Sequence, residues 1–248
     1  MRWDLLIEKV RRSFCGVCLL CRDRQASTNE HIFASALGGT LHLKLLCSRC
    51  NNVVGGKLVN ATKRDRRLII PVYYQLRPKL PNVAHKFLRG LPLVGARNGG
   101  KETLSYGSNG IEFPKGTDER DFIEIVPYLS APNAPDASFL LIAYEMAALA
   151  VGAPIMDAPL DPFRADILAM KNSTGRVKFA HQPTGKLFHG AAIRCLNSVL
   201  TVDVMFYGSA RFRVQLGPAQ ASPEWTELVY SQSLWTGRPE VRKIQKST

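Results

Sequence analysis

The chain has 248 residues, of which 46% are hydrophobic and 21% are charged. This composition excludes a chain that is disordered throughout and allows one large domain, or a small domain plus a larger one. The net charge is +13 and is unevenly placed: residues 1–80 hold 15 Lys and Arg against 5 Asp and Glu, a balance of +10, and the remaining residues contribute +3. Clustered positive charge is typical of polyanion binders, because neutralised phosphates release condensed counterions. We therefore expect a nucleic acid as partner; a basic surface that serves solubility or faces a membrane is the alternative.

The first 13 residues contain no uninterrupted apolar core of the kind that a signal peptide needs, since acidic and basic residues break it up. The longest apolar run, Phe139–Val151, contains Glu145 and is too short to cross a bilayer. We expect Glu145 to face solvent from a helix. We also expect a cytoplasmic protein with no membrane partner, a compartment in which clustered cysteines bind metal more often than they form disulfides.

Five of the six cysteines lie in the first 50 residues, and they form C-x-x-C pairs. Cys18 with Cys21 and Cys47 with Cys50 supply the four thiolates that a tetrahedral Zn²⁺ site requires. The gap between these pairs is longer than the usual ~15–20 residues, which an inserted β-hairpin would explain. Cys15 also forms a C-x-x-C with Cys18, so the residues alone leave two choices for the first pair.

The segment between the pairs predicts a compact unit of strand, loop, strand and helix. Asn29–Phe33 is the first strand, a turn with two glycines follows, and Leu41–Leu46 is the second strand. The helix follows the second cysteine pair, although the glycines at 55 and 56 weaken it. This arrangement brings residues near positions 30, 42 and 51 together.

Those positions hold residues suited to phosphodiester hydrolysis. His31 titrates near neutral pH, so it can accept a proton from water. Glu30 and Asn51 offer a carboxylate and an amide oxygen, which are hard ligands for Mg²⁺ or Mn²⁺. A Glu-His dipeptide alone is weak evidence, because such residues usually lie at the surface. Its position between the two C-x-x-C pairs is what makes a catalytic role worth considering.

Residues Cys18 to Gly55 resemble the HNH endonuclease family, also called ββα-metal or His-Me finger nucleases. The similarity rests on C-x-x-C, Glu-His-Ile, Leu-Gly-Gly and C-x-x-C-Asn-Asn in this order, and it is to the branch with a structural zinc. It covers under a fifth of the chain, but the ordered set of motifs is specific. The spacing of this family favours Cys18 and Cys21 over Cys15 as zinc ligands, together with Cys47 and Cys50.

The resemblance also implies roles for single residues. His31 corresponds to the general base that activates water, and Glu30 and Asn51 correspond to the ligands of a catalytic metal. The family usually has Asn at the middle position, where this chain has His42; this residue either orients His31 through a hydrogen bond or faces solvent. Some members place another metal-binding His at the position of Gly55, so its absence implies a site with two protein ligands and more bound water. A further departure is an alanine at position 34, where proline is common.

Seven basic residues flank this segment or follow it, and we expect them to bind phosphates without reading sequence: Lys44, Arg49, Lys57, Lys63, Arg64, Arg66 and Arg67. For any one of them, a solvated charged face is an equally good interpretation.

The remainder, residues 63–248, predicts a mixed α+β domain with no motif for chemistry. We expect a β-like segment at Leu68–Tyr74, a helix from a Ser138 cap to about Val151, and a second helix at about Pro162–Lys171. Strands are expected at Val177–Ala180, Leu187–Leu196, Val199–Tyr207 and Ala210–Leu216, and a frayed tail after Trp235.

The sequence therefore predicts an α+β protein with a zinc-stapled ββα-metal module at residues 1–62 and a mixed α+β domain at 63–248, which would serve specificity, oligomerisation or regulation. The predicted function is a metal-dependent endonuclease that acts on DNA in preference to RNA, with structural zinc and a catalytic Mg²⁺ or Mn²⁺. It could serve restriction-like or anti-phage defence, or a mobile element. The alternatives are a non-catalytic zinc module that binds nucleic acid, which would not need Glu30, His31 and Asn51 together, and a protein–protein adaptor, which the basic charge disfavours.

Overall fold

A computed structural model describes residues 16–128, 133–152, 160–196, 199–218 and 225–245 of the chain. The chain divides into two compact units, one made of Met1–Thr62 with Ala134–Thr248 and the other of Lys63–Asn133. The division after residue 62 is also the one drawn from the sequence. Residues 134–248, however, group with the N-terminal module and not with residues 63–133.

The N-terminal module has the expected order of strand, loop, strand and helix. Strand β1 (Thr28–His31) pairs with β2 (His42–Leu46) in an antiparallel ribbon, with the short turn η1 (Ser35–Leu37) between them. Helix α2 (Ser48–Cys50), a π-helical turn η2 (Asn51–Gly55) and α3 (Gly56–Lys63) follow without a break. Along β2, His42 and Lys44 are exposed while Leu43 and Leu45 are buried, so the ribbon has one solvent face and one core face.

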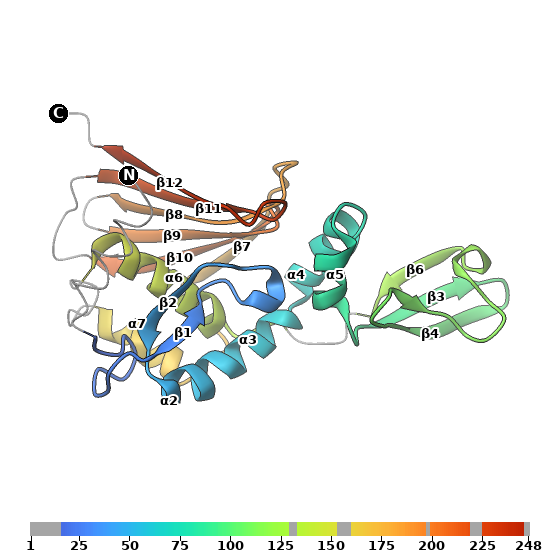
Figure 1. The fold of residues 1–248 in the computed structure, drawn as a ribbon, viewed down its shortest axis with the longest axis horizontal. Helices are drawn as coiled ribbons and strands as arrows, with labels where there is room; N and C mark the ends of the chain where they lie inside the picture. Colours follow the sequence, from blue (N-terminus) through green and yellow to red (C-terminus); the bar gives the residue numbers. More distant parts are fainter. Residues whose placement is uncertain (1–15, 129–132, 153–159, 197–198, 219–224, 246–248) are drawn as a thin grey trace. The chain divides into compact units, whose positions relative to one another are not determined.

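A long helix, α6 (Asp136–Val151), lies between this module and a six-stranded antiparallel sheet (Figure 1). Every residue from Ala137 to Leu149 is buried, as expected of a helix that is apolar all round. The sheet has the order β12-β11-β8-β9-β10-β7. Its strands are β7 (Val177–His181), β8 (Phe188–Leu196), β9 (Val199–Phe206), β10 (Ala210–Pro218), β11 (Trp225–Ser233) and β12 (Pro239–Gln245).

The core between α6 and the sheet is aromatic. Phe139 of α6 stacks on Phe212 of β10 with ring centroids 3.7 Å apart, and Phe206 of β9 meets both rings edge-on. Helix α7 (Asp161–Leu168) packs beside α6. Together these contacts set the position of α6, which the N-terminal module contacts through Ser138 and Leu58.

Two sequence expectations in this unit need correction. The expected helix at 138–151 is present, but it starts at Asp136, and Ser138 lies inside it with its hydroxyl donating to the Leu58 carbonyl (3.3 Å) rather than capping the helix. The prediction of a frayed tail after Trp235 is wrong for Pro239–Gln245, which form β12 and pair with β11. The four expected strands between residues 177 and 216 are all present.

The second unit contains α4 (Arg66–Pro71), η3 (Val72–Leu76), α5 (Pro81–Leu88), the short turn η4 (Glu119–Asp121) and a four-stranded antiparallel sheet. The sheet has the order β5-β4-β3-β6, from β3 (Pro92–Arg97), β4 (Gly100–Tyr106), β5 (Ile111–Glu112) and β6 (Glu124–Pro127). The β-like prediction for Leu68–Tyr74 is wrong, since this stretch is helical. Its buried residues Leu68, Val72 and Leu76 recur every four positions, and Asp65 caps the helix by accepting from the Arg67 amide.

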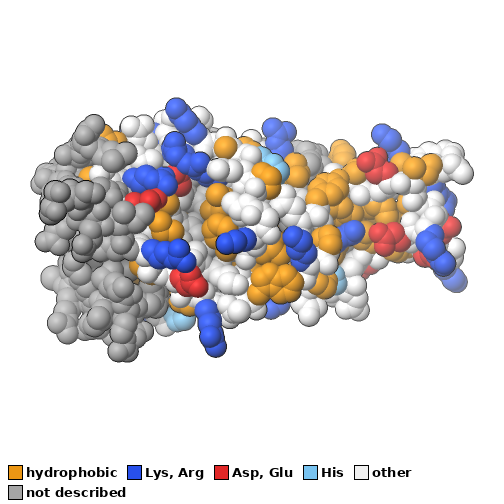
Figure 2. Space-filling view, turned by 90° about the horizontal axis from the view of Figure 1, so that it is seen from above, with side chains coloured by type: hydrophobic (Ala, Val, Ile, Leu, Met, Phe, Trp, Pro, Cys, Tyr) orange, Lys and Arg blue, Asp and Glu red, His pale blue; other side chains and the backbone are white. Residues whose placement is uncertain are grey.

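Basic side chains do not merge into one patch on the face drawn in Figure 2, where Lys and Arg stand apart among apolar and uncharged atoms. Among the described residues, no helix combines the length and the apolar character that a bilayer crossing demands.

Candidate active site and metal centre

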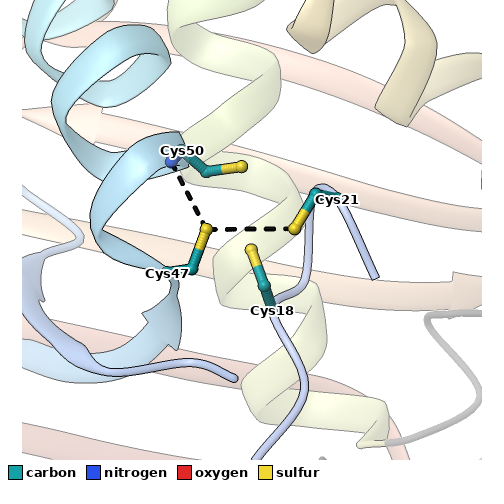
Figure 3. Close-up of side chains that lie close together, drawn as sticks. All are labelled: Cys18, Cys21, Cys47 and Cys50. Carbon is teal, nitrogen blue, oxygen red and sulfur yellow. Dashed lines mark hydrogen bonds between the residues drawn. The ribbon is translucent and has the colours of Figure 1, made fainter. Parts of the chain in front are cut away.

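Four cysteine sulfurs converge at one end of the module (Figure 3). The ligand atoms of Cys18, Cys21, Cys47 and Cys50 all lie within 4.8 Å of one another. The sulfurs of Cys21 and Cys47 are 3.8 Å apart. A tetrahedral zinc with sulfurs at about 2.3 Å would separate its ligands by about 3.8 Å, so the spacing suits such an ion.

Local backbone geometry accounts for this convergence. The Cys18 amide donates to the Arg24 carbonyl (2.7 Å) and the Arg22 amide to the Cys18 carbonyl (3.0 Å), which folds the first knuckle back on itself. Cys47 caps α2, and its sulfur accepts from the Cys50 amide (3.5 Å). The structure thus brings together the four predicted zinc ligands; the competing Cys15 lies outside the described residues.

The pKa values of these thiols are shifted in opposite directions. Burial raises the pKa of Cys18, and burial together with the neighbouring Cys18 raises that of Cys50. Burial also opposes ionisation of Cys21, but backbone hydrogen bonds from Asp23 and Arg24 outweigh it and lower its pKa to about 7. Thiols must lose their protons to bind a metal, so the cluster binds a cation best at neutral or higher pH.

Glu30, His31 and Asn51 line one cavity of about 330 Å³. Its walls come from β1, the turn after β1, η2, α3 and α6. Both segments of the first unit, residues 1–62 and 134–248, therefore contribute to it. Glu30 and His31 are neighbours on β1, yet Glu30 is only 6% exposed while His31 is exposed. The structure therefore gathers the three predicted chemical residues in one place.

Asn51 begins the π-helical turn, and such turns often occur at functional sites. Gly55 lies against the side chain of Asn51. A Cβ added at Gly55 would stand 3.0 Å from the Asn51 Oδ1, closer than most real Cβ contacts. The glycine that replaces a possible family histidine therefore leaves room for the Asn51 side chain.

His42 is the cross-strand partner of His31, with ring centroids 5.5 Å apart. The His42 Nδ1 lies 3.0 Å from the Thr40 carbonyl, which fixes the ring on the solvent side of β2. The pKa of His31 is lowered by partial burial and by the nearby His42. A lowered pKa favours the neutral imidazole, which is the form that accepts a proton.

Glu145 of α6 lines the same cavity, and the expectation that it faces solvent is wrong: it is 3% exposed. Its carboxyl group shares a hydrogen bond with Glu30. Burial raises the pKa of Glu30 to about 7, and burial and the Glu30 charge raise that of Glu145 well above its usual range. The only hint of this buried position in the sequence was that Glu145 is a charged residue within an otherwise apolar helix.

The turn after β1 is held by the six-stranded sheet. The Leu37 carbonyl accepts from His189 (2.7 Å), and the Gly38 carbonyl accepts from the Gln232 amide (3.0 Å). The Thr40 amide in turn donates to the Gln232 Oε1 (3.0 Å). These bonds hold the loop that joins β1 to β2 beside the candidate site.

The seven predicted basic residues are divided between the two units. Lys44, Arg49 and Lys57 are exposed on the module. The other four belong to the second unit, and there the Arg67 guanidinium pairs with the buried Asp65 (2.6 Å).

Comparison with protein families gives one finding: residues 15–66 match a family model described as HNH endonuclease. Comparison with curated proteins and with solved structures gives no match. The matched segment contains the four clustered cysteines and Glu30, His31, His42 and Asn51. Residues 15–66 therefore form a domain of the HNH endonuclease family.

Proposed function

We propose that this chain is a metal-dependent endonuclease that hydrolyses DNA phosphodiester bonds, with His31 as the general base. The observation that supports this most is the meeting of His31, Glu30 and Asn51 in one cavity inside the HNH domain. A domain that only binds nucleic acid has no need of a histidine and two hard oxygen ligands in a shared pocket.

The four-cysteine cluster would hold zinc with a structural role. Four sulfurs complete a tetrahedral shell and leave no open position for substrate, which is typical of structural zinc. The ion would join the knuckle before β1 to the start of α2, and so maintain the distance between Glu30 and Asn51.

Glu30 and Asn51 would hold a catalytic Mg²⁺ or Mn²⁺. The site fits such a cation, because both residues supply oxygen and the buried Glu30 Oε1 has no hydrogen-bond partner among the described residues. Bound there, the cation would stabilise negative charge on the phosphate and on the leaving oxygen.

His31 would take the proton of an attacking water as the water oxygen bonds to phosphorus. The bond from phosphorus to the leaving oxygen then breaks, and that oxygen is protonated from solvent. We assign His42 to a positioning role, since its ring is fixed by Thr40 beside His31. Partial burial keeps His31 neutral and ready to accept the proton.

The exposed Lys44, Arg49 and Lys57 would contact the phosphate backbone, with help from Lys63, Arg64, Arg66 and Arg67. Contacts of this kind position a duplex without reading its sequence. The clustered free thiols fit a cytoplasmic protein, where reducing conditions preserve them.

The test is cleavage of supercoiled plasmid DNA, and of an RNA of similar length, with Mg²⁺ or Mn²⁺ present or omitted. The wild type should cut DNA only with the cation, and His31→Ala should cut about 10²–10⁴-fold more slowly, since this is the usual contribution of a general base. His181→Ala is the matched control, because His181 lies on the exposed strand β7 and outside the cavity.

Equal cleavage by the wild type and His31→Ala would remove His31 as the base. If neither protein cuts and both bind DNA equally, the chain is a binding module and not a nuclease.

A further inference from the structure

The cavity contains a carboxylate from outside the HNH domain. Glu145 belongs to α6, whereas the family match ends at residue 66. The chain nevertheless brings Glu145 to the wall of the cavity that Glu30 also lines, and both side chains are buried. Helix α6 packs on the six-stranded sheet, so the position of Glu145 is set by the core of the first unit.

Glu30 and Glu145 are buried acidic residues that line one cavity, and two carboxylates held in this way are stabilised by a positive charge between them. Within the described part of the chain, no Lys or Arg forms an ion pair with either group. The positive charge can come from a shared proton or from a shared cation.

The surroundings favour a cation. The Glu30 Oε1 is buried and, among the described residues, has no hydrogen-bond partner, so its lone pairs are available to a cation. Asn51 brings an amide oxygen to the same cavity, whose volume of about 330 Å³ accommodates an ion together with water or a phosphate. Mg²⁺ and Mn²⁺ prefer such oxygen ligands.

We propose that Glu145 is a third protein ligand of the catalytic metal, so that one divalent cation lies between Glu30, Asn51 and Glu145. This proposal rests on the proposed function, because it concerns the same metal. It replaces the two-ligand site that the HNH segment alone would offer. Two carboxylates neutralise a divalent cation, which should raise its affinity above that of a site with one carboxylate and one amide.

The experiment is calorimetric titration of the purified full chain with Mn²⁺, with its zinc cluster left loaded. Two variants remove the proposed ligand in steps: Glu145→Gln keeps an oxygen but no charge, and Glu145→Met keeps a similar length but no oxygen. Met also suits an all-buried helix, so this variant should fold even if the Gln variant does not. Thermal unfolding without Mn²⁺ checks that each variant is folded.

Glu30→Gln serves as the positive control. Glu227→Gln is the matched negative control, because it makes the same chemical change on β11, where Glu227 pairs with Arg194 (2.6 Å) far from the cavity lining. We expect Mn²⁺ affinity to fall about tenfold or more in Glu145→Gln, further in Glu145→Met, and not at all in Glu227→Gln.

Wild-type Mn²⁺ affinity in Glu145→Met would overturn the proposal and assign the pair to a shared proton. If Glu30→Gln alone loses affinity, Glu145 is not a ligand and the proposed nuclease function still stands. If the Glu145 variants lose affinity while the wild type cuts no nucleic acid, the metal site is as proposed and the nuclease function fails.

Discussion

His189 is a buried histidine that the fold keeps uncharged. Its ring is wholly inaccessible, stacks on Phe33 with centroids 5.3 Å apart, and donates to the Leu37 carbonyl. Burial lowers its pKa from 6.5 to about 4. In the unfolded chain the same ring would titrate near 6.5, so between pH 6.5 and pH 4 the unfolded state binds a proton that the folded state does not.

This difference makes His189 a source of acid sensitivity. Stability from this residue is complete above pH 6.5 and is lost as the pH falls toward 4, by about 3 kcal/mol for a shift of this size. The buried Glu30 and Glu145 act in the opposite sense, because their raised pKa values favour the folded state at low pH.

We predict that His189→Gln reduces the loss of unfolding free energy between pH 7 and pH 4.5 by about 2–3 kcal/mol relative to the wild type. Urea unfolding at both pH values measures this, and the comparison of two proteins cancels the contribution of the carboxyl groups. The variant should be less stable at pH 7, since it loses ring stacking. Parallel losses in both proteins would show that His189 does not carry this sensitivity.

At the scale of single elements, the turn between β1 and β2 depends on its two glycines. Gly38 has φ of +93°, a left-handed conformation that most residues avoid. A Cβ on Gly39 would overlap the carbonyl group of Phe33, which is backbone and cannot rotate away. The Leu-Gly-Gly motif is thus a steric requirement of the active-site loop.

Gly39→Ala should therefore destabilise the protein by about 1–3 kcal/mol, the usual cost of forcing an extra carbon into a packed site. Gly56→Ala is the matched control: its Cβ would meet only the Asn51 carbonyl at 3.9 Å, an ordinary contact, within helix α3. Alanine there should stabilise by about 0.5–1 kcal/mol. Urea unfolding of both variants provides the measurement, and a Gly39→Ala protein as stable as the wild type would contradict the steric argument.

The sequence predicted the elements of the active site whose determinants are local. The cysteine pairs, the Glu-His strand and the double glycine each act within a few residues, so the module's order of elements and its four-cysteine cluster were predicted correctly. The strand prediction for Leu68–Tyr74 was wrong. Its β-branched and aromatic residues favour strands, but its buried positions recur every four residues, which is the spacing of a helix.

Glu145 could not be placed from the sequence, because its environment is made by residues far away in the chain. Helix α6 is buried on every side, so it carries no polar face from which the orientation of Glu145 could be read. The six strands were recognisable one by one, but their order and the position of the module against α6 depend on long-range packing that no local pattern encodes.

At the scale of the whole molecule, the HNH domain shares its core with the C-terminal part of the chain. Phe33 contacts His189, Phe206 and Tyr230 of the sheet. Arg164 of α7 donates to the Leu20 carbonyl in the first knuckle (2.7 Å). The residues of the second unit, in contrast, are an insertion between Thr62 and Ala134.

We therefore predict that residues 1–62 alone do not fold, even with zinc, because Phe33 and Leu37 would be exposed to water. Residues 1–62 joined to 134–248 by a flexible Gly/Ser linker should fold, since this keeps the first unit whole. Cooperative thermal unfolding and dispersed amide NMR signals would report folding. A folded 1–62 fragment would show that the module is independent of the sheet.

The wall that α6 contributes to the cavity also has a consequence for biosynthesis. The Glu-His motif leaves the ribosome before Ser138, Leu141 and Glu145, which line another wall of the cavity and follow more than 100 residues later. The strands that hold α6 emerge later still. A nascent chain that stops before α6 would thus carry the motif without its pocket, so the candidate site is complete only once α6 and the strands that hold it have been made.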